Sequence, residues 1–218
     1  MRILLVNGSP RRAAANSRIF LDSLRARLGE GHDYRLVETM AGEAAIEDLD
    51  ADFLVLAFPL YNNCLHSRLL AWLLSYETLL QSARASGKTR GKVGMIAVAN
   101  SGCPDGGVQN RIALEIVADF CERTGVEWRG GLGVGSGEMT GLLKRAPEGM
   151  PLKRPVSRAL DEIASRVVNG AAPPGEIFAA YLFPWPLFRF AAHAEWKRRA
   201  RANGLGPREL RARPFASR

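Results

Sequence analysis

The strongest constraint on the fold is a short run, Phe53 to Phe58, in which every side chain is apolar. A strand that is apolar on both faces must be covered on both faces, which is typical of parallel sheets flanked by helices. The run ends abruptly at Pro59 and a polar loop, and an apolar stripe from about Ser67 to Arg84 then predicts a helix. The sequence therefore predicts a strand–loop–helix unit of an α/β fold.

The same alternation of strand and helix repeats along the chain. Strands are expected at 2–6, 33–38, 53–58, 93–99 and 126–134, and helices at 17–28, 67–84, a segment ending near 123, and 155–168. This order predicts one five-stranded parallel sheet with helices on both faces. Ligands of such sheets bind beyond the carboxyl ends of the strands. Long polar loops follow the first, third and fourth strands, so we expect a site where these loops meet.

The loop after the first strand has the composition of an anion site. It reads Asn7-Gly8-Ser9-Pro10-Arg11-Arg12, with Asn16 and Ser17 at the start of the next helix. The backbone N–H groups at a helix start are unpaired and carry partial positive charge, and Gly8 would let a ligand approach closely. We expect a phosphate monoester here, although neither a P-loop nor a dinucleotide glycine pattern is present. The alternative is an ordinary turn with Ser17 as a helix N-cap.

Composition limits the compartment and the chemistry. Cys64, Cys103 and Cys121 form no C-x-x-C pair and predict reduced thiols in a cytoplasmic protein. No cluster of His and Cys has the spacing of a metal site, and the first residues do not resemble a signal peptide. The formal net charge is +8, and most of it lies from Arg189 onward, where nine Lys or Arg stand against two Asp or Glu.

Three loop sequences together carry a resemblance to a known family: Asn7-Gly8-Ser9-Pro10-Arg11 with Asn16-Ser17, Pro59-Leu60-Tyr61-Asn62-Asn63, and Asn100-Ser101-Gly102. They are similar to the three FMN-contacting loops of flavodoxin-like NAD(P)H-dependent FMN or quinone reductases. The resemblance implies a flavodoxin-like three-layer sandwich with strand order 2-1-3-4-5. It covers residues 1–170, the expected FMN-binding domain, and leaves 171–218 as a C-terminal extension.

The resemblance implies a role for each loop. The residues that would hold the FMN phosphate are Ser9, Arg11, Asn16 and Ser17. Those that would border the isoalloxazine are Pro59, Leu60, Tyr61, Asn62 and Asn63, with Tyr61 stacking on the ring. Those that would close the other side are Asn100, Ser101 and Gly102.

The chemistry that the resemblance implies belongs to the cofactor. Hydride would pass from NADH or NADPH to FMN, and electrons would pass on to a quinone, a free flavin or another small acceptor. No catalytic side chain, metal or nucleic acid is expected, and relatives are commonly homodimers or homotetramers. Two alternatives stay open, because a fold does not fix a function: an electron carrier without a nicotinamide site, and a flavin-free binding module.

The C-terminal extension is aromatic between Ile177 and Trp196 and basic after that. Prolines and Arg189 interrupt the apolar pattern, so a membrane span is not expected. The extension either packs on the domain or on a partner subunit, or it lies on an anionic membrane surface.

Several residues near the expected site have more than one interpretation. His66 stands where many relatives have proline, and it could cap a helix, lie on the surface or touch a substrate. Cys64 and Cys103 lie in converging loops and are either redox-active or incidental. The loop from Gly135 to Gly141 is either a flap over the flavin or a flexible connection.

Overall fold

The computed structural model describes residues 1–87, 91–169, 175–206 and 209–212 of the chain. It divides into two compact units, Met1–Tyr181 and Leu182–Arg218, which are described separately below.

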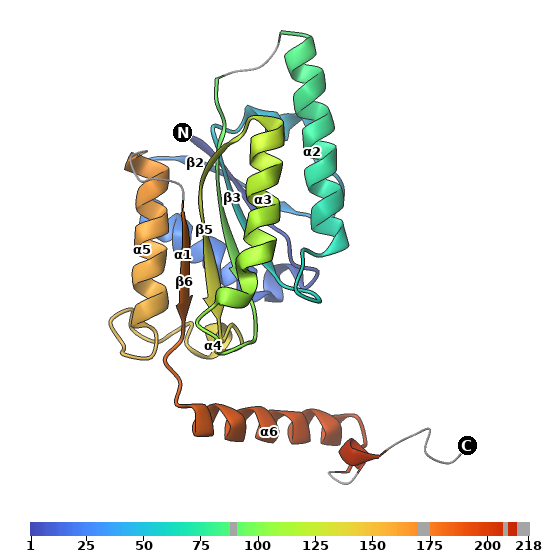
Figure 1. Cartoon of the computed structure of the whole chain (residues 1–218), viewed down its shortest axis with the longest axis vertical. Coiled ribbons are helices and arrows are strands. Elements are labelled where there is room, and N and C mark those ends of the chain that lie inside the picture. The colour runs from blue at the N-terminus through green and yellow to red at the C-terminus, as the bar shows by residue number, and fades with distance from the viewer. Residues whose placement is uncertain (88–90, 170–174, 207–208, 213–218) are drawn as a thin grey trace, which may run out of the picture. The chain divides into compact units, whose positions relative to one another are not determined.

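The first unit is built on one parallel sheet with strand order β2-β1-β3-β4-β5-β6 (Figure 1). The strands are β1 (Arg2–Asn7), β2 (Asp33–Glu38), β3 (Phe53–Pro59), β4 (Gly94–Asn100), β5 (Glu127–Gly135) and β6 (Glu176–Ala180). The five predicted strands and their order 2-1-3-4-5 are confirmed.

The sixth strand corrects the prediction of a five-stranded sheet. The sequence places residues 176–180 in the C-terminal extension, but β6 pairs with β5 along its whole length, from Gly131 opposite Glu176 to Gly135 opposite Ala180. This short segment merges in sequence with the aromatic residues that follow it. Its strand structure depends on a long-range partner, the edge of β5, which a local pattern does not show.

The helices cover both faces of the sheet (Figure 1). They are α1 (Asn16–Leu28), α2 (Ser67–Ala85), α3 (Arg111–Thr124), the single turn α4 (Met139–Leu142) and α5 (Arg154–Asn169). The helices α2 and α3 lie on one face, and α1 and α5 lie together on the other. The predicted helices are confirmed, and α4 is an addition within a segment for which the sequence predicted no element.

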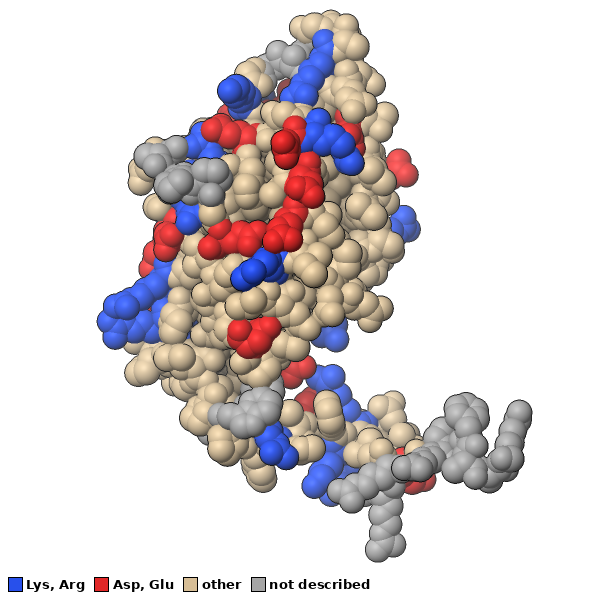
Figure 2. All heavy atoms as spheres, in the orientation of Figure 1, with Lys and Arg blue, Asp and Glu red and all other residues tan. Residues whose placement is uncertain are grey.

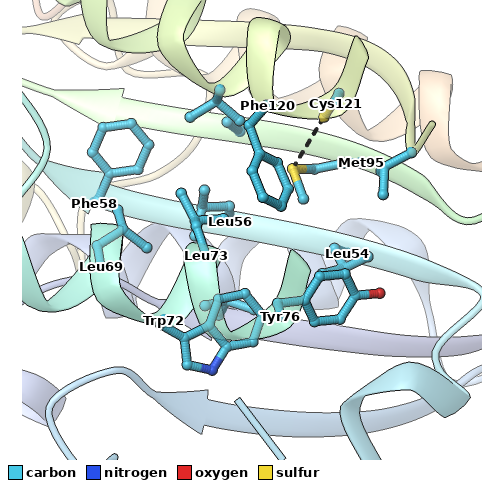
Figure 3. Packing of buried hydrophobic residues seen from close by; sticks show 14 of the residues in the cluster. Leu54, Leu56, Phe58, Leu69, Trp72, Leu73, Tyr76, Met95, Phe120 and Cys121 are labelled. Carbon is cyan, nitrogen blue, oxygen red and sulfur yellow. Dashed lines mark hydrogen bonds between the residues drawn. The ribbon is translucent and has the colours of Figure 1, made fainter. Parts of the chain in front are cut away.

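A hydrophobic core lies between the sheet and the helices α2 and α3 (Figure 3). Leu54, Leu56 and Phe58 alternate along β3 and point toward α2, where Trp72 stacks on Tyr76 with ring centroids 5.4 Å apart. Trp72 is 1% exposed and lies in the core. Cys121 on α3 is also buried here, and burial raises the pKa of its thiol to about 12, so it remains a protonated apolar side chain.

From Gly131 to its end, β5 presents only glycine to α3 and the loop before it, whereas Trp128 earlier in the strand packs against the core beside α3. Gly131, Gly133 and Gly135 share this face, and a Cβ at Gly131 would lie 2.8 Å from Leu114 of α3. A Cβ at Gly133 would lie 2.8 Å from the carbonyl oxygen of Gly107. The absence of side chains on this face lets the backbone after β4 lie directly against β5.

Charge is unevenly distributed over the first unit. Figure 2 shows acidic side chains gathered on the face in front of α3 and β6. Burial, followed by repulsion from Glu115 on α3, raises the pKa of Glu176 on β6. The sequence before Arg189 carries a net charge of only +1, yet one face of this unit is acidic.

The second unit contains α6 (Trp185–Ala202) and a short 3-10 turn at Glu209–Arg211. Within α6, Glu195 Oε1 accepts hydrogen bonds from Arg198 at 2.7 Å and from Arg199 at 2.8 Å. No helix in the described part of the chain is both long and apolar enough to span a membrane.

Candidate functional site at the carboxyl edge of the sheet

Three strands end side by side at one edge of the sheet. Asn7 at the end of β1 lies opposite Ala57 of β3, and Pro59 at the end of β3 lies opposite Asn100 of β4. The loops that follow these strands span residues 8–15, 60–66 and 101–110. Their polar residues therefore start from one edge, as the strand–helix order predicts.

The first loop is shaped by the buried side chain of Asn7. Its Oδ1 accepts a hydrogen bond from the N–H of Ser9 at 3.1 Å, and its Nδ2 donates to the carbonyl oxygen of Arg12 at 3.0 Å. The same Nδ2 donates to Glu38 at 2.9 Å. These bonds hold Arg12 at a φ of 50°, which is unusual for a residue with a side chain. Asn7 was not among the predicted site residues, although it belongs to the motif.

The start of α1 is free of a side-chain cap. Its N-cap is Ala15, whose side chain has no acceptor, so only the N–H of Arg18 finds a partner there, the carbonyl oxygen of Ala15 at 3.2 Å. Ser17 is the second residue of α1 and is buried. It therefore lies within the first turn and is not the N-cap that the alternative interpretation expected. Arg11, whose side chain is exposed, lies in the loop that leads into this helix. Unpaired amides next to a cation form an environment that favours an anion.

Ser9 and Gly8 lie deeper in the loop than the sequence suggests. Ser9 is 1% exposed, and its Oγ accepts the N–H of Arg11 at 3.3 Å. A Cβ at Gly8 would lie 2.8 Å from Leu69 Cδ2 and 2.9 Å from the Cβ of Phe58. Glycine at this position is therefore explained by packing of the loop against the core, and not by approach to a ligand.

The second loop is a tight hairpin that fixes Tyr61. The backbones of Tyr61 and Cys64 exchange two hydrogen bonds, of 2.9 and 3.0 Å, around Asn62 and Asn63. Both asparagines have positive φ, 49° and 62°, as in the two-residue hairpin turns that favour asparagine. Tyr61 remains 40% exposed, with its ring 5.2 Å from that of His66.

The other residues around the hairpin secure its position. Leu60 donates its N–H to the carbonyl oxygen of Asn100 at 2.9 Å, and Pro59 ends β3. Asn63 accepts a hydrogen bond from Gln109 at 2.8 Å, which joins the hairpin to the loop after β4. His66 Nδ1 accepts the N–H of Arg68 at 3.2 Å, so its observed role is to cap α2.

Asn100 links the ends of β3 and β4 to the start of α1. Its Nδ2 donates to the carbonyl oxygen of Phe58 at 3.0 Å and to Ser17 Oγ at 3.4 Å. The side chain is 5% exposed. Asn100 therefore positions the loops against one another from inside.

The third loop is anchored to β5 and to the segment after it. Ser101 donates its N–H to Val134 at 2.9 Å and accepts the N–H of Gly137 at 2.7 Å. Asn110 Nδ2 donates to the carbonyl oxygen of Gly107 at 2.8 Å, and a Cβ at Gly102 would have 3.8 Å of clearance from Glu138. Gly102 is thus exposed and not tightly packed against its neighbours.

The segment after β5 also joins the site. Asn16 Nδ2 donates to the carbonyl oxygen of Gly137 at 2.7 Å, across the start of α1. Residues 135–140 are buried except for Glu138. Asn110 was not predicted, and Gly137 was expected only as part of a flap or a flexible connection, because an asparagine or a glycine in a loop gives no local signal of a distant partner.

The thiols of this edge differ in exposure. Cys64 is exposed in the hairpin, and Cys103 is half-buried. Over the described residues, no group of three or more His, Cys, Asp or Glu side chains could hold a metal ion.

The comparisons with known proteins concern the fold. No family model and no curated protein matches the chain. Among solved structures, a flavone reductase matches with a TM-score of 0.54 and 12% identity, over 80% of this chain and 66% of that chain. The flavodoxin of Streptococcus pneumonia TIGR4 matches with a TM-score of 0.53 and 13% identity, over 78% of this chain and 100% of that chain. The chain has a flavodoxin-like fold.

A third flavodoxin-like structure is an NADPH-quinone reductase from P. pentosaceus. It matches with a TM-score of 0.52 and 16% identity, over 79% of this chain and 100% of that chain. The structural agreement establishes the common flavodoxin-like fold, and at such low identities the activity has to be argued from the site.

Proposed function

We propose that the carboxyl edge of the sheet binds FMN and that the protein passes electrons from NADH or NADPH to a small acceptor such as a quinone. The observation that carries the proposal is the uncapped start of α1 beside Arg11, at the end of the first strand of a flavodoxin-like fold. Two of the three similar structures are named as reductases, one of them of quinones, which supports this class of reaction.

The first loop fits a phosphate monoester by the chemistry of its donors. The amides of Asn16 and Ser17 open α1 without a cap, and Arg11 adds a guanidinium. The hydroxyl of Ser9 accepts one bond, from the N–H of Arg11, and that of Ser17 accepts one from Asn100 of β4, so each can still donate its proton to a phosphate oxygen. Asn16 would act through Gly137, by holding the neighbouring segment in place.

The other two loops fit a planar ring system. Tyr61 offers an exposed aromatic face on a hairpin that cannot easily shift, because two left-handed asparagines and two backbone hydrogen bonds define it. Ser101 and Gly102 would border the opposite side. Asn100 would position the loops and would not contact the ring, because its amide is already occupied.

Bound FMN would supply the hydride and electron chemistry. The work of the chain would be to bind the phosphate, to hold the ring between the second and third loops, and to exclude water from its buried side. None of these tasks needs a side chain that gains or loses a proton.

The first test is whether the purified protein retains FMN after addition and desalting. Affinity is measured by quenching of flavin fluorescence. Arg11→Ala is expected to weaken binding about tenfold, the effect of losing one charged hydrogen bond. Arg158→Ala, an exposed arginine of α5, is the control and should leave the affinity unchanged. Equal affinity in wild type, R11A and S9A would contradict the phosphate site.

The second test separates the possible activities. Anaerobic bleaching of bound FMN by NADH or NADPH supports a reductase, whereas a retained flavin that neither donor bleaches identifies an electron carrier. A protein that is colourless after addition of excess FMN and desalting would be a flavin-free binding module. Tyr61→Ala should alter the visible spectrum of bound flavin, and an unchanged spectrum would remove Tyr61 from the ring contact.

A further inference from the structure

A cavity of about 550 Å³ lies on the face of the sheet opposite to α2. We call it the α1/α5 cavity, because these two helices form its long walls. Its apolar surface comes from Ile19 and Phe20 on α1 and from Val156 and Leu160 on α5. The size and the mostly apolar lining are those of a site for a small molecule.

One wall of the α1/α5 cavity is polar and fully paired. Arg27 donates to Asp161 at 2.6 Å, to Glu148 at 3.0 Å and to Ser157 at 2.9 Å. Lys153 pairs with Glu148 as well. Since these groups satisfy one another, this wall is structural and offers a ligand little.

The end of the cavity near α4 is different. Thr140 is 2% exposed, and its Oγ1 has no hydrogen-bond partner among the residues that the structure describes. Tyr181, 5% exposed, lines the same end. Its hydroxyl interacts with that of Thr140, which lowers the pKa of Tyr181 less than burial raises it, but the two hydroxyls do not reach the geometry of a hydrogen bond. Burial raises the pKa of Tyr181, so its phenol stays protonated and able to donate. A buried hydroxyl without a partner is costly, and a ligand oxygen would remove the cost.

The unpaired charge at the rim is positive. The carboxylates of Asp22, Glu148 and Asp161 are all in ion pairs. Lys144 lines the cavity, is exposed, and forms no ion pair with any residue that the structure describes. The rim therefore favours an anion over a cation.

We propose that the α1/α5 cavity binds a small aromatic carboxylate. The ring would lie against Phe20 and Leu160, and the carboxylate would accept hydrogen bonds from Thr140 and Tyr181 while Lys144 balances its charge. This site is distinct from the proposed FMN site, since none of its residues lies in the three loops of the carboxyl edge. The two sites adjoin at the segment after β5, where Thr140 follows Gly137, the partner of Asn16.

The test is calorimetric titration of the full-length protein with 2-naphthoate, with and without saturating FMN. One saturable site is expected in both conditions. Lys144→Gln, Thr140→Val and Tyr181→Phe should each weaken binding about tenfold, as for a lost hydrogen bond to a charged group. Thr78→Val, an exposed threonine of α2, is the matched control and should have no effect.

Two further measurements keep the test decisive. Ala26 is exposed and lines the cavity, so Ala26→Trp should block the cavity without disturbing the core and abolish binding. The neutral analogue 2-naphthamide should be insensitive to K144Q. Absence of saturable binding, binding unchanged in A26W and K144Q, or displacement of 2-naphthoate by FMN would each overturn the proposal.

Discussion

The contact between Gly107 and the last two strands makes a sharp test of the fold. A Cβ at Gly107 would lie 2.3 Å from the carbonyl oxygen of Gly133 on β5 and 2.9 Å from that of Ala179 on β6. Both are backbone atoms, so the clash cannot be relieved by a side-chain rotation. Gly107→Ala should therefore force the loop after β4 away from the sheet and loosen β6 in particular.

The magnitude can be separated into two parts. Gly107 has a φ of 93°, and a left-handed backbone costs a residue with a side chain about 1–2 kcal/mol. Overpacking adds about 1–3 kcal/mol, so the total loss of unfolding free energy is about 2–5 kcal/mol. Gly106 supplies the control, because its φ is 75° but nothing lies within 4 Å of its Cβ position. Gly106→Ala should cost only the first part.

The assay is urea unfolding of wild type, G106A and G107A, followed by far-UV circular dichroism. The difference between the two variants measures the steric contact alone, since both are glycine-to-alanine changes in the left-handed region. Equal destabilisation of the two variants would refute the packing of this loop against β5 and β6.

Three further predictions concern stability. Asn100→Ala leaves the carbonyl oxygen of Phe58 without its donor and should cost about 1–3 kcal/mol in urea unfolding; a loss below about 0.5 kcal/mol would show that Asn100 does not join the strand ends. Desolvation raises the pKa of Glu148, but bonds from Lys153, Ser157 and Arg27 outweigh it and lower the pKa to about 2. The stabilisation is thus present above pH 4.5 and lost as pH falls toward 2. Glu148→Gln should therefore reduce the fall of unfolding free energy at acid pH, by less than about 1 kcal/mol because the carboxylate is half-exposed. Parallel stability–pH curves of wild type and variant would contradict this. Leu73→Ala should lower the free energy of unfolding in urea by about 2–5 kcal/mol, and the neighbouring Leu74→Ala far less, since Leu73 is 1% and Leu74 48% exposed. Equal losses would contradict the face of α2 that packs on the sheet.

Much of the fold could be predicted because its signals are local. The apolar run from Phe53 to Phe58 marks a strand covered on both faces, and the stripe after Ser67 marks a helix that ends one residue later than expected, at Ala85. β6 has no such signal, since five residues next to an aromatic stretch become a strand only by pairing with β5.

The candidate site was predictable in place but not in detail. Strand–loop–helix order puts the three loops at one edge, whatever their side chains do. The packing of Gly8 against Leu69 and the bond from Asn16 to Gly137 join residues far apart in sequence. The α1/α5 cavity could not be predicted, because a hydroxyl such as that of Thr140 is known to lack a partner only when its surroundings are known.

The glycine face of β5 has a consequence for loop grafting between proteins of this architecture. A Cβ at Gly135 would lie 2.7 Å from the backbone nitrogen of Gly107, so strand and loop meet backbone to backbone. A grafted loop of equal length would fit only if it had a glycine at the position of Gly107. A side chain introduced at Gly135 would clash with the native loop. The strand and the loop after β4 are therefore one exchangeable module, and neither can be transplanted without the other.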